Sequence, residues 1–201
     1  MQVDKFILGE LQTNCYLLTS DHSAKALVID PADDGDFIND ELLRRNLTLE
    51  AVLLTHGHFD HCLGLLSLYT AWAMPIYLHP ADKFLLKKAP ASAKHWLGID
   101  ADPVPNSTHD LSDQQNLQLI DEDWQVIHTP GHTPGSVCFL QKNSKDLFSG
   151  DTIFAGGSVG RTDFAYSKPQ DMRQSLEKLK QLRLDGVYSE VFSGHGESFF
   201  S

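Results

Sequence analysis

The sequence predicts an α/β fold, a sandwich in which two mixed β-sheets pack together and helices cover their outer faces. Strand and helix patterns alternate along the chain, and several continuous apolar runs have the length of strands buried on both faces. The chain has 201 residues, of which 41% are hydrophobic and 21% are charged. These values are typical of a globular protein, and we expect one domain over residues 1–201.

The first half of the chain is expected to contain four strands and two helices. Apolar runs between polar turns predict strands at residues 15–20, 25–31, 49–55 and 76–79. Apolar residues at helical spacing predict helices at residues 34–46 and 61–74. The second helix is expected to end before Pro75, because proline cannot continue a helix.

The second half is expected to begin with a loop and to continue mainly as strands. Residues 89–113 are rich in Pro, Asp, Ser and Asn, which predicts a surface excursion. Further strands are predicted at residues 116–120, 124–129, 136–141, 146–151 and 187–196. One more helix is predicted at residues 168–182, with a proline near its start.

The composition indicates which classes of partner are disfavoured and in which cellular compartment the protein is expected. Asp and Glu number 27 against 16 Lys and Arg, and this formal charge of -11 disfavours nucleic acid or an anionic membrane as a partner. Residues 1–10 lack the pattern of a secretory signal. Cys15, Cys62 and Cys138 form no C-x-x-C pair and are expected to be buried thiols. We expect a cytoplasmic protein that is a monomer or a small homo-oligomer.

The stretch THGHFDH at residues 55–61 predicts a metal site. His56 and His58 are two apart on an extended segment, so their side chains face the same way. Asp60 and His61 follow at the switch from strand to helix. Imidazole and carboxylate are ligands that zinc, manganese and non-haem iron accept.

Three later residues repeat this arrangement. His132, Asp151 and His195 each follow an apolar strand and lie beside a glycine. Loops at strand ends are where α/β folds assemble sites, so all these side chains are expected to converge. Asp30 also follows a strand, and its role as a support for the ligands is left open. We expect the remaining histidines to be ordinary polar residues: His22, His79, His95, His109 and His128.

The motifs THGHFDH, GHTPGS, SGDT and GHG, in this order, resemble those of the metallo-β-lactamase superfamily. Within it, the chain is most similar to the glyoxalase II-like hydrolases (hydroxyacylglutathione hydrolases). The similarity runs from TNCYLL and ALVIDPA through GGSVGRTDF to SGHGE. The resemblance implies an αββα sandwich, the metallo-β-lactamase fold, with a binuclear metal site at one edge.

The resemblance also implies a ligand set and a reaction. One metal would take His56, His58 and His132, and the other Asp60, His61 and His195, with Asp151 bridging them. Two divalent ions are expected, zinc first, with iron and manganese as alternatives. A metal-bound hydroxide, held with the help of Asp60 and Asp151, would attack a small-molecule thioester such as S-lactoylglutathione. A thiol with a pKa near 8.5 leaves without a general acid.

Two features bear on the substrate that the resemblance implies. Full-length glyoxalase II enzymes carry a C-terminal helical region that contacts glutathione, and this chain is expected to lack it, since it ends at Ser201. Arg161, in GGSVGRTDF, is a candidate contact for a substrate carboxylate, because arginine is a planar, always-charged donor. Its alternative role is to brace the loop.

Two other functions remain open for this sequence. Persulfide dioxygenases also resemble it and hold one Fe(II) through two histidines and an aspartate, which correspond here to His56, His132 and Asp151. A catalytically idle metal-binding protein is the third reading. Metal content and oxygen consumption distinguish these functions.

Overall fold

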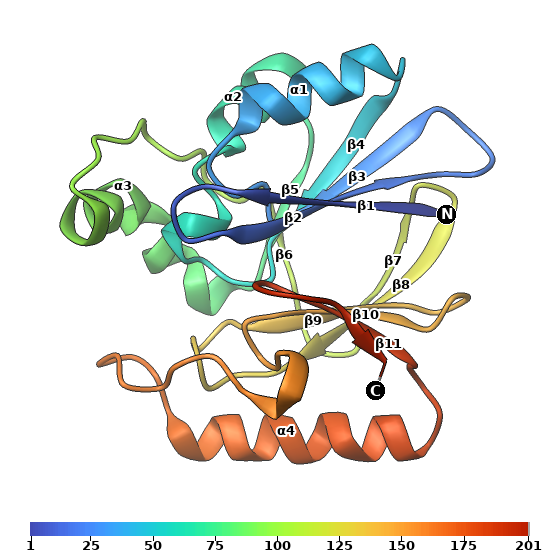
Figure 1. Ribbon diagram of the computed structural model, residues 1–201, viewed down its shortest axis with the longest axis vertical. Helices are drawn as coiled ribbons and strands as arrows, with labels where there is room; N and C mark the ends of the chain where they lie inside the picture. The colour runs from blue at the N-terminus through green and yellow to red at the C-terminus, as the bar shows by residue number, and fades with distance from the viewer. Residues whose placement is uncertain (201) are drawn as a thin grey trace.

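The computed structural model describes residues 1–200 and confirms the predicted sandwich of two mixed sheets (Figure 1). The first sheet has the order β1 (Gln2–Leu8), β2 (Thr13–Thr19), β3 (Lys25–Ile29), β4 (Thr48–Leu53), β5 (Ile76–Leu78) and β6 (His109–Asp110). The second has the order β12 (Phe199–Phe200), β11 (Glu190–Ser193), β10 (Asp146–Gly150), β9 (Val137–Gln141), β8 (Glu122–His128) and β7 (Asn116–Leu119).

Helices cover the outer face of each sheet (Figure 1). The first sheet is covered by α1 (Gly35–Arg44), α2 (Leu65–Trp72) and α3 (Lys83–Leu97). The second is covered by α4 (Pro169–Leu184). Three short 3-10 turns lie in the connections: η1 (Phe59–His61), η2 (Pro80–Asp82) and η3 (Ala155–Gly157). Within residues 1–200, no helix combines the length and apolarity needed to cross a bilayer.

Strand alternation explains why one strand serves two cores. Tyr16 and Leu18 of β2 face the second sheet, where they join Trp124 and Phe148 in the central core. Leu17, between them, faces the helices of the first layer. Successive side chains of a strand point to opposite faces, so a continuous apolar run is required when both faces are covered. The three cysteines are free and buried, as predicted.

Two local predictions were wrong. β1 was not expected, because most of its residues are partly exposed and show no clean alternation; only its antiparallel register with β2 defines it as a strand. The loop predicted from residue 89 is helical as far as Leu97, and α3 continues through Pro90. Leu86, Ala89 and Ala93 are buried at helical spacing, and this packing offsets the roughly 3 kcal/mol cost of an internal proline.

The parallel strands place the ends of several segments at one edge of the sandwich. β3 pairs in parallel with β4, and β10 pairs in parallel with β11. The loops that leave β4, β8, β10 and β11 therefore come close together in space, although they lie far apart in the sequence.

Candidate metal centre

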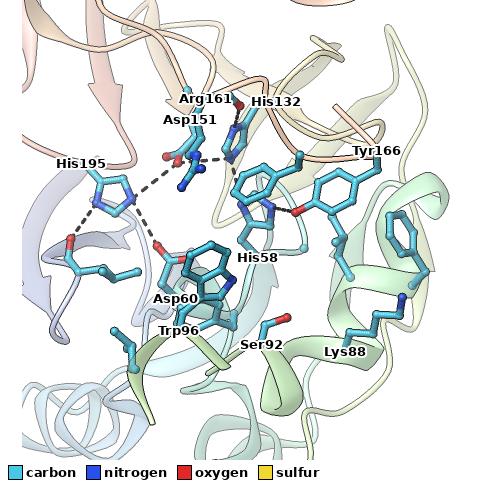
Figure 2. A pocket seen from close by; sticks show the side chains of 18 of the residues that line it. His58, Asp60, Lys88, Ser92, Trp96, His132, Asp151, Arg161, Tyr166 and His195 are labelled. Atoms are coloured by element: carbon cyan, nitrogen blue, oxygen red, sulfur yellow. Dashed lines mark hydrogen bonds and ion pairs between the residues drawn. The ribbon is translucent and has the colours of Figure 1, made fainter. Parts of the chain in front are cut away.

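All seven predicted ligand residues meet at this edge of the sandwich. Figure 2 labels His58, Asp60, His132, Asp151 and His195 among them. One loop after β4 supplies His56, His58, Asp60 and His61. The loops after β8, β10 and β11 supply one residue each: His132, Asp151 and His195. The structure thus brings together every residue that the motifs single out, while their binding of metal remains a prediction.

Three imidazoles form the first half of the centre. Nε2 of His56 lies 3.1 Å from Nδ1 of His58, and that Nδ1 lies 2.9 Å from Nε2 of His132. The three nitrogens all lie within 4.8 Å of one another. Three converging imidazole nitrogens are a typical ligand set for a transition metal ion.

Asp60, His61 and His195 form the second half. Oδ2 of Asp60 lies 3.4 Å from Nε2 of His61 and 3.4 Å from Nε2 of His195. These ligand atoms also lie within 4.8 Å of one another. The chain therefore offers a second group of three, with one carboxylate in place of an imidazole.

The Asp151 carboxylate lies between the two halves. Its Oδ1 is 3.5 Å from Nε2 of His61, and its Oδ2 is 3.5 Å from Nε2 of His132 and 3.7 Å from Nε2 of His195. Oδ1 of Asp151 and Nε2 of His61 are buried and have no hydrogen-bond partner among the described residues. Buried polar atoms are nearly always satisfied, so an imidazole nitrogen and a carboxylate oxygen that face each other in this way fit a cation-binding site.

Burial and neighbouring charges shift the pKa values of the histidines in opposite directions in the two halves. Burial lowers the pKa of His56 well below its usual value and that of His58 to about 3, and neighbouring imidazoles add to the effect. Both rings are therefore neutral, as metal ligands must be. Burial also acts to lower the pKa of His61, but the carboxylates of Asp60, Asp151 and Asp30 outweigh it and raise that pKa to about 10. The carboxylate half thus favours a positive charge.

Hydrogen bonds on the side away from the centre orient three of its imidazoles. Nδ1 of His61 donates to Oδ2 of buried Asp30 at 2.9 Å, which leaves Nε2 free toward the centre. Nδ1 of His132 donates to the carbonyl of Arg161 at 2.7 Å, and Nδ1 of His195 donates to the carbonyl of Leu11 at 3.1 Å. Such outer partners set the tautomer and the direction of a metal-binding imidazole. The contact between His61 and Asp30 is the one that a supporting role of Asp30 requires, and that role stays a prediction. Asp30 also forms a candidate metal group with His56 and His61.

Asp82 is an organising residue that the sequence patterns did not reveal. Its buried carboxylate accepts from the backbone N–H of Gly57 at 3.0 Å, from that of Gly135 at 2.7 Å and from Oγ1 of Thr133 at 2.6 Å. It therefore ties the loop that carries His58 to the loop that carries His132. Its partners lie 25 to 53 residues away in the sequence, so no local motif could mark it.

Replacing Asp82 with alanine is expected to destabilise the protein by about 3 kcal/mol, because it leaves buried N–H and hydroxyl groups unpaired. The free energy of unfolding in urea measures this. Asp100→Ala is the control, since Asp100 pairs with Lys94 at the surface and its loss should have a far smaller effect. Equal midpoints for the two variants would contradict the role given to Asp82.

Tyr166 reaches the centre through His58. Nδ1 of His58 faces the other imidazole nitrogens, so its Nε2 carries the hydrogen and donates to the Tyr166 hydroxyl at 2.8 Å. Burial raises the pKa of Tyr166 to about 12, so the phenol stays neutral.

Tyr166→Phe is expected to weaken zinc binding about 10-fold, because His58 loses the partner that holds its ring. Competition with a chromophoric chelator measures the affinity. Tyr69→Phe, on the outer helix α2, is the matched control and should bind zinc like the unaltered protein. An unchanged affinity in Tyr166→Phe would show that the ring of His58 needs no such support.

Arg161 lies at the border of the centre, with its side chain 55% exposed. Its Nε and Nη2 donate to the Asp163 carboxylate, each at 2.7 Å, and its guanidinium lies 4.5 Å from the centroid of the Phe164 ring. The guanidinium also lies 5.8 Å from the centroid of the Trp96 ring on α3. The contacts with Asp163 and Phe164 brace the loop, and the contact with substrate remains a prediction. The five histidines expected to be ordinary polar residues belong to none of the three candidate metal groups found within residues 1–200.

A cavity of about 650 Å³ opens beside the centre (Figure 2). The centre forms its floor with His58, Asp60, His132, Asp151 and His195. Its walls are mostly apolar and come from α3 and from the loop after η3: Phe84, Leu85, Lys88, Ser92, Trp96, Leu97, Arg161, Phe164 and Tyr166. A small molecule can therefore reach both halves of the centre.

Comparisons with known proteins agree with this geometry. The family model of the metallo-beta-lactamase superfamily matches residues 8–195. The chain is 36% identical over 191 residues to the probable metallo-hydrolase YqgX of Bacillus subtilis, covering 94% of this chain and 87% of that protein. It is 30% identical over 204 residues to the hydroxyacylglutathione hydrolase GloC of Haemophilus influenzae, covering 98% and 91%. The crystal structure of TTHA1623 in a di-iron-bound form superposes with a TM-score of 0.88 at 34% identity, covering 98% and 94%.

Proposed function

The chain belongs to the metallo-beta-lactamase superfamily, and from this premise we propose that it is a binuclear metal-dependent hydrolase that cleaves thioesters. The observation that carries the proposal is the position of the Asp151 carboxylate between two groups of three ligand residues. A single tetrahedral ion cannot use that many ligands, whereas two ions sharing one carboxylate can.

The residues divide between two cations in a defined way. His56, His58 and His132 would hold one, Asp60, His61 and His195 the other, and Asp151 would contact both. Bound divalent cations supply acidification of water and polarisation of a carbonyl oxygen. We propose zinc as the resident metal, and the di-iron form of TTHA1623 supports iron as the alternative.

The chain's own groups fit attack on a thioester carbonyl. The Asp60 carboxylate accepts from Oγ1 of Thr13 at 3.0 Å, and this bond keeps it directed at the floor of the cavity. The carboxylates of Asp60 and Asp151 can orient water there and accept its proton. A thiolate departs without protonation because the pKa of its conjugate acid is about 8.5, so the site needs no separate general acid.

The thioester class takes its support from GloC, whose name states hydroxyacylglutathione hydrolysis and whose sequence aligns with 98% of this chain. The direct test is release of thiol from S-lactoylglutathione by the zinc-loaded protein. Hydrolysis with two metals per chain is the expected result. If one iron per chain and oxygen consumption with a persulfide were found instead, the hydrolase proposal would be wrong and a dioxygenase would replace it.

A further inference from the structure

One face of α3 lines the cavity with an unusual set of side chains. This set consists of Phe84, Lys88, Ser92 and Trp96, which follow one another at intervals of four residues and so lie on the same side of the helix. Figure 2 labels Lys88, Ser92 and Trp96. Phe84 is 39% exposed and Trp96 is 54% exposed. Large apolar side chains that stay exposed beside a candidate centre indicate a ligand surface.

A second segment, the loop after η3, adds aromatic rings to this wall. The rings of Phe164 and Tyr166 are stacked, with centroids 5.3 Å apart and planes 15° from parallel. The Tyr166 ring lies 5.6 Å from that of Phe84, and the Phe164 ring lies 6.5 Å from that of Trp96. Phe164 also lies 5.3 Å from the ring of His58. The Arg161 guanidinium lies 5.8 Å from the Trp96 centroid and 4.5 Å from the Phe164 centroid. Rings from two separate segments therefore contact one another along one side of the cavity next to the imidazole half, and their exposed parts offer an apolar surface to a flat group.

Lys88 is the cation of this wall that remains available. Among residues 1–200, no carboxylate lies within ion-pair distance of its Nζ, which is 5.8 Å from the Phe84 ring. By contrast, Arg161 is held by Asp163 through two hydrogen bonds, and Lys83 and Lys94 of the same helix pair with aspartates. The lining can thus neutralise one anionic group on a ligand.

We propose that the α3 face and the Phe164–Tyr166 loop form a subsite for a flat aromatic group that carries one anionic substituent. The group would belong to the acyl or to the thiol side of the substrate, and this assignment rests on the proposed thioesterase function. Hydrolysis breaks the acyl C–S bond, forms a C–O bond to water and leaves a proton for the thiolate. Glutathione offers no ring, so S-lactoylglutathione would reach the metal centre without filling this subsite.

The test compares thioesters that differ only in the ring. On the thiol side, the acetyl thioester of para-(mercaptomethyl)benzoate is compared with that of mercaptopropionate. On the acyl side, the para-carboxyphenylacetyl thioester of N-acetylcysteamine is compared with the succinyl thioester. Each pair keeps one carboxylate and the same kind of leaving thiol. In the pair whose ring reaches the subsite, the aryl thioester is expected to show a kcat/KM at least about 10-fold higher than that of its partner without a ring.

Single substitutions test whether the preference for the aryl thioester, expressed as the ratio of the two kcat/KM values, depends on Trp96 and Lys88. Trp96→Ala is expected to reduce the ratio to about 1–2, since the ring loses its apolar contact. Tyr69→Ala, an aromatic on α2 that is 37% exposed, is the matched control and should keep the ratio. The unaltered protein is expected to prefer the aryl substrate with a free carboxylate over the same substrate as its methyl ester, because Lys88 neutralises the carboxylate. Lys88→Gln should remove this preference. A ratio that is the same in Trp96→Ala and in the unaltered protein would overturn the proposal.

A binding measurement separates this subsite from the proposed reaction. The methyl thioether of para-(mercaptomethyl)benzoate cannot be hydrolysed, and calorimetry should show it binding at least about 10-fold more weakly to Trp96→Ala. Binding that depends on Trp96 without hydrolysis of any thioester would refute the hydrolase and support the subsite. Hydrolysis without a ring preference, together with no binding of the thioether, would refute the subsite alone.

Discussion

Asp151→Asn is expected to lower kcat/KM for thioester hydrolysis by a factor on the order of 10³. The carboxylate lies within 3.5–3.7 Å of nitrogens from both halves of the centre, and no other described carboxylate does so. An amide of the same size keeps the packing but cannot balance the charge of two cations. The variant should therefore also bind at most one metal per chain. Steady-state kinetics and metal analysis of the same preparation measure both effects.

The control for this substitution lies on the same strand. Asp146 begins β10, at the end remote from the centre, and accepts a hydrogen bond from Ser144. Asp146→Asn makes the same chemical change there and should keep both metals and the activity. If Asp151→Asn retained two metals and full activity, Asp151 would have no bridging role.

Removing the metals is expected to abolish hydrolysis and to lower the free energy of unfolding by about 4 kcal/mol for each metal, compared with protein in zinc at about 1,000 times its dissociation constant. The physical reason is mutual repulsion and unsatisfied groups in the metal-free cluster, where buried atoms of His61 and Asp151 lack hydrogen-bond partners. Denaturant unfolding with chelator, with zinc and after zinc is restored measures the change.

A pair of histidine variants checks that this stabilisation comes from the centre. His58→Ala removes one of the three converging imidazoles, so zinc should stabilise this variant much less. His22→Ala removes an exposed imidazole outside the centre and should leave the response to zinc unchanged. Equal unfolding midpoints with and without zinc in the unaltered protein would rule out a structural contribution of the metals.

The candidate ligand residues could be selected from the sequence because each one follows a recognisable strand. The spacing of His56 and His58 places both side chains on one side of an extended segment, and glycines beside His132, Asp151 and His195 mark turns at strand ends. Burial of the strands also followed from local pattern, since an apolar run such as β4 needs cover on both faces. These features depend on neighbours within a few residues.

Contacts over long sequence distances had to come from the structure. The helical state of residues 89–97 depends on burial of Ala89 and Ala93 against the first layer, which outweighs the local effect of Pro90. The Asp82 carboxylate joins two loops that no motif connects. The contact of Asp30 with His61 likewise could be seen only in the structure.

The sequence by itself determined the fold class, the family resemblance and the residues of the candidate centre, because periodicity and short motifs encode them locally. Only the tertiary structure decided where Asp151 lies between the two groups of ligands and which side chains form the wall above them. Phe84, Trp96 and Tyr166 stand apart in the sequence and have ordinary local patterns. Their common position depends on how α3 and the loop after η3 pack, which is a property of the assembled chain rather than of any segment.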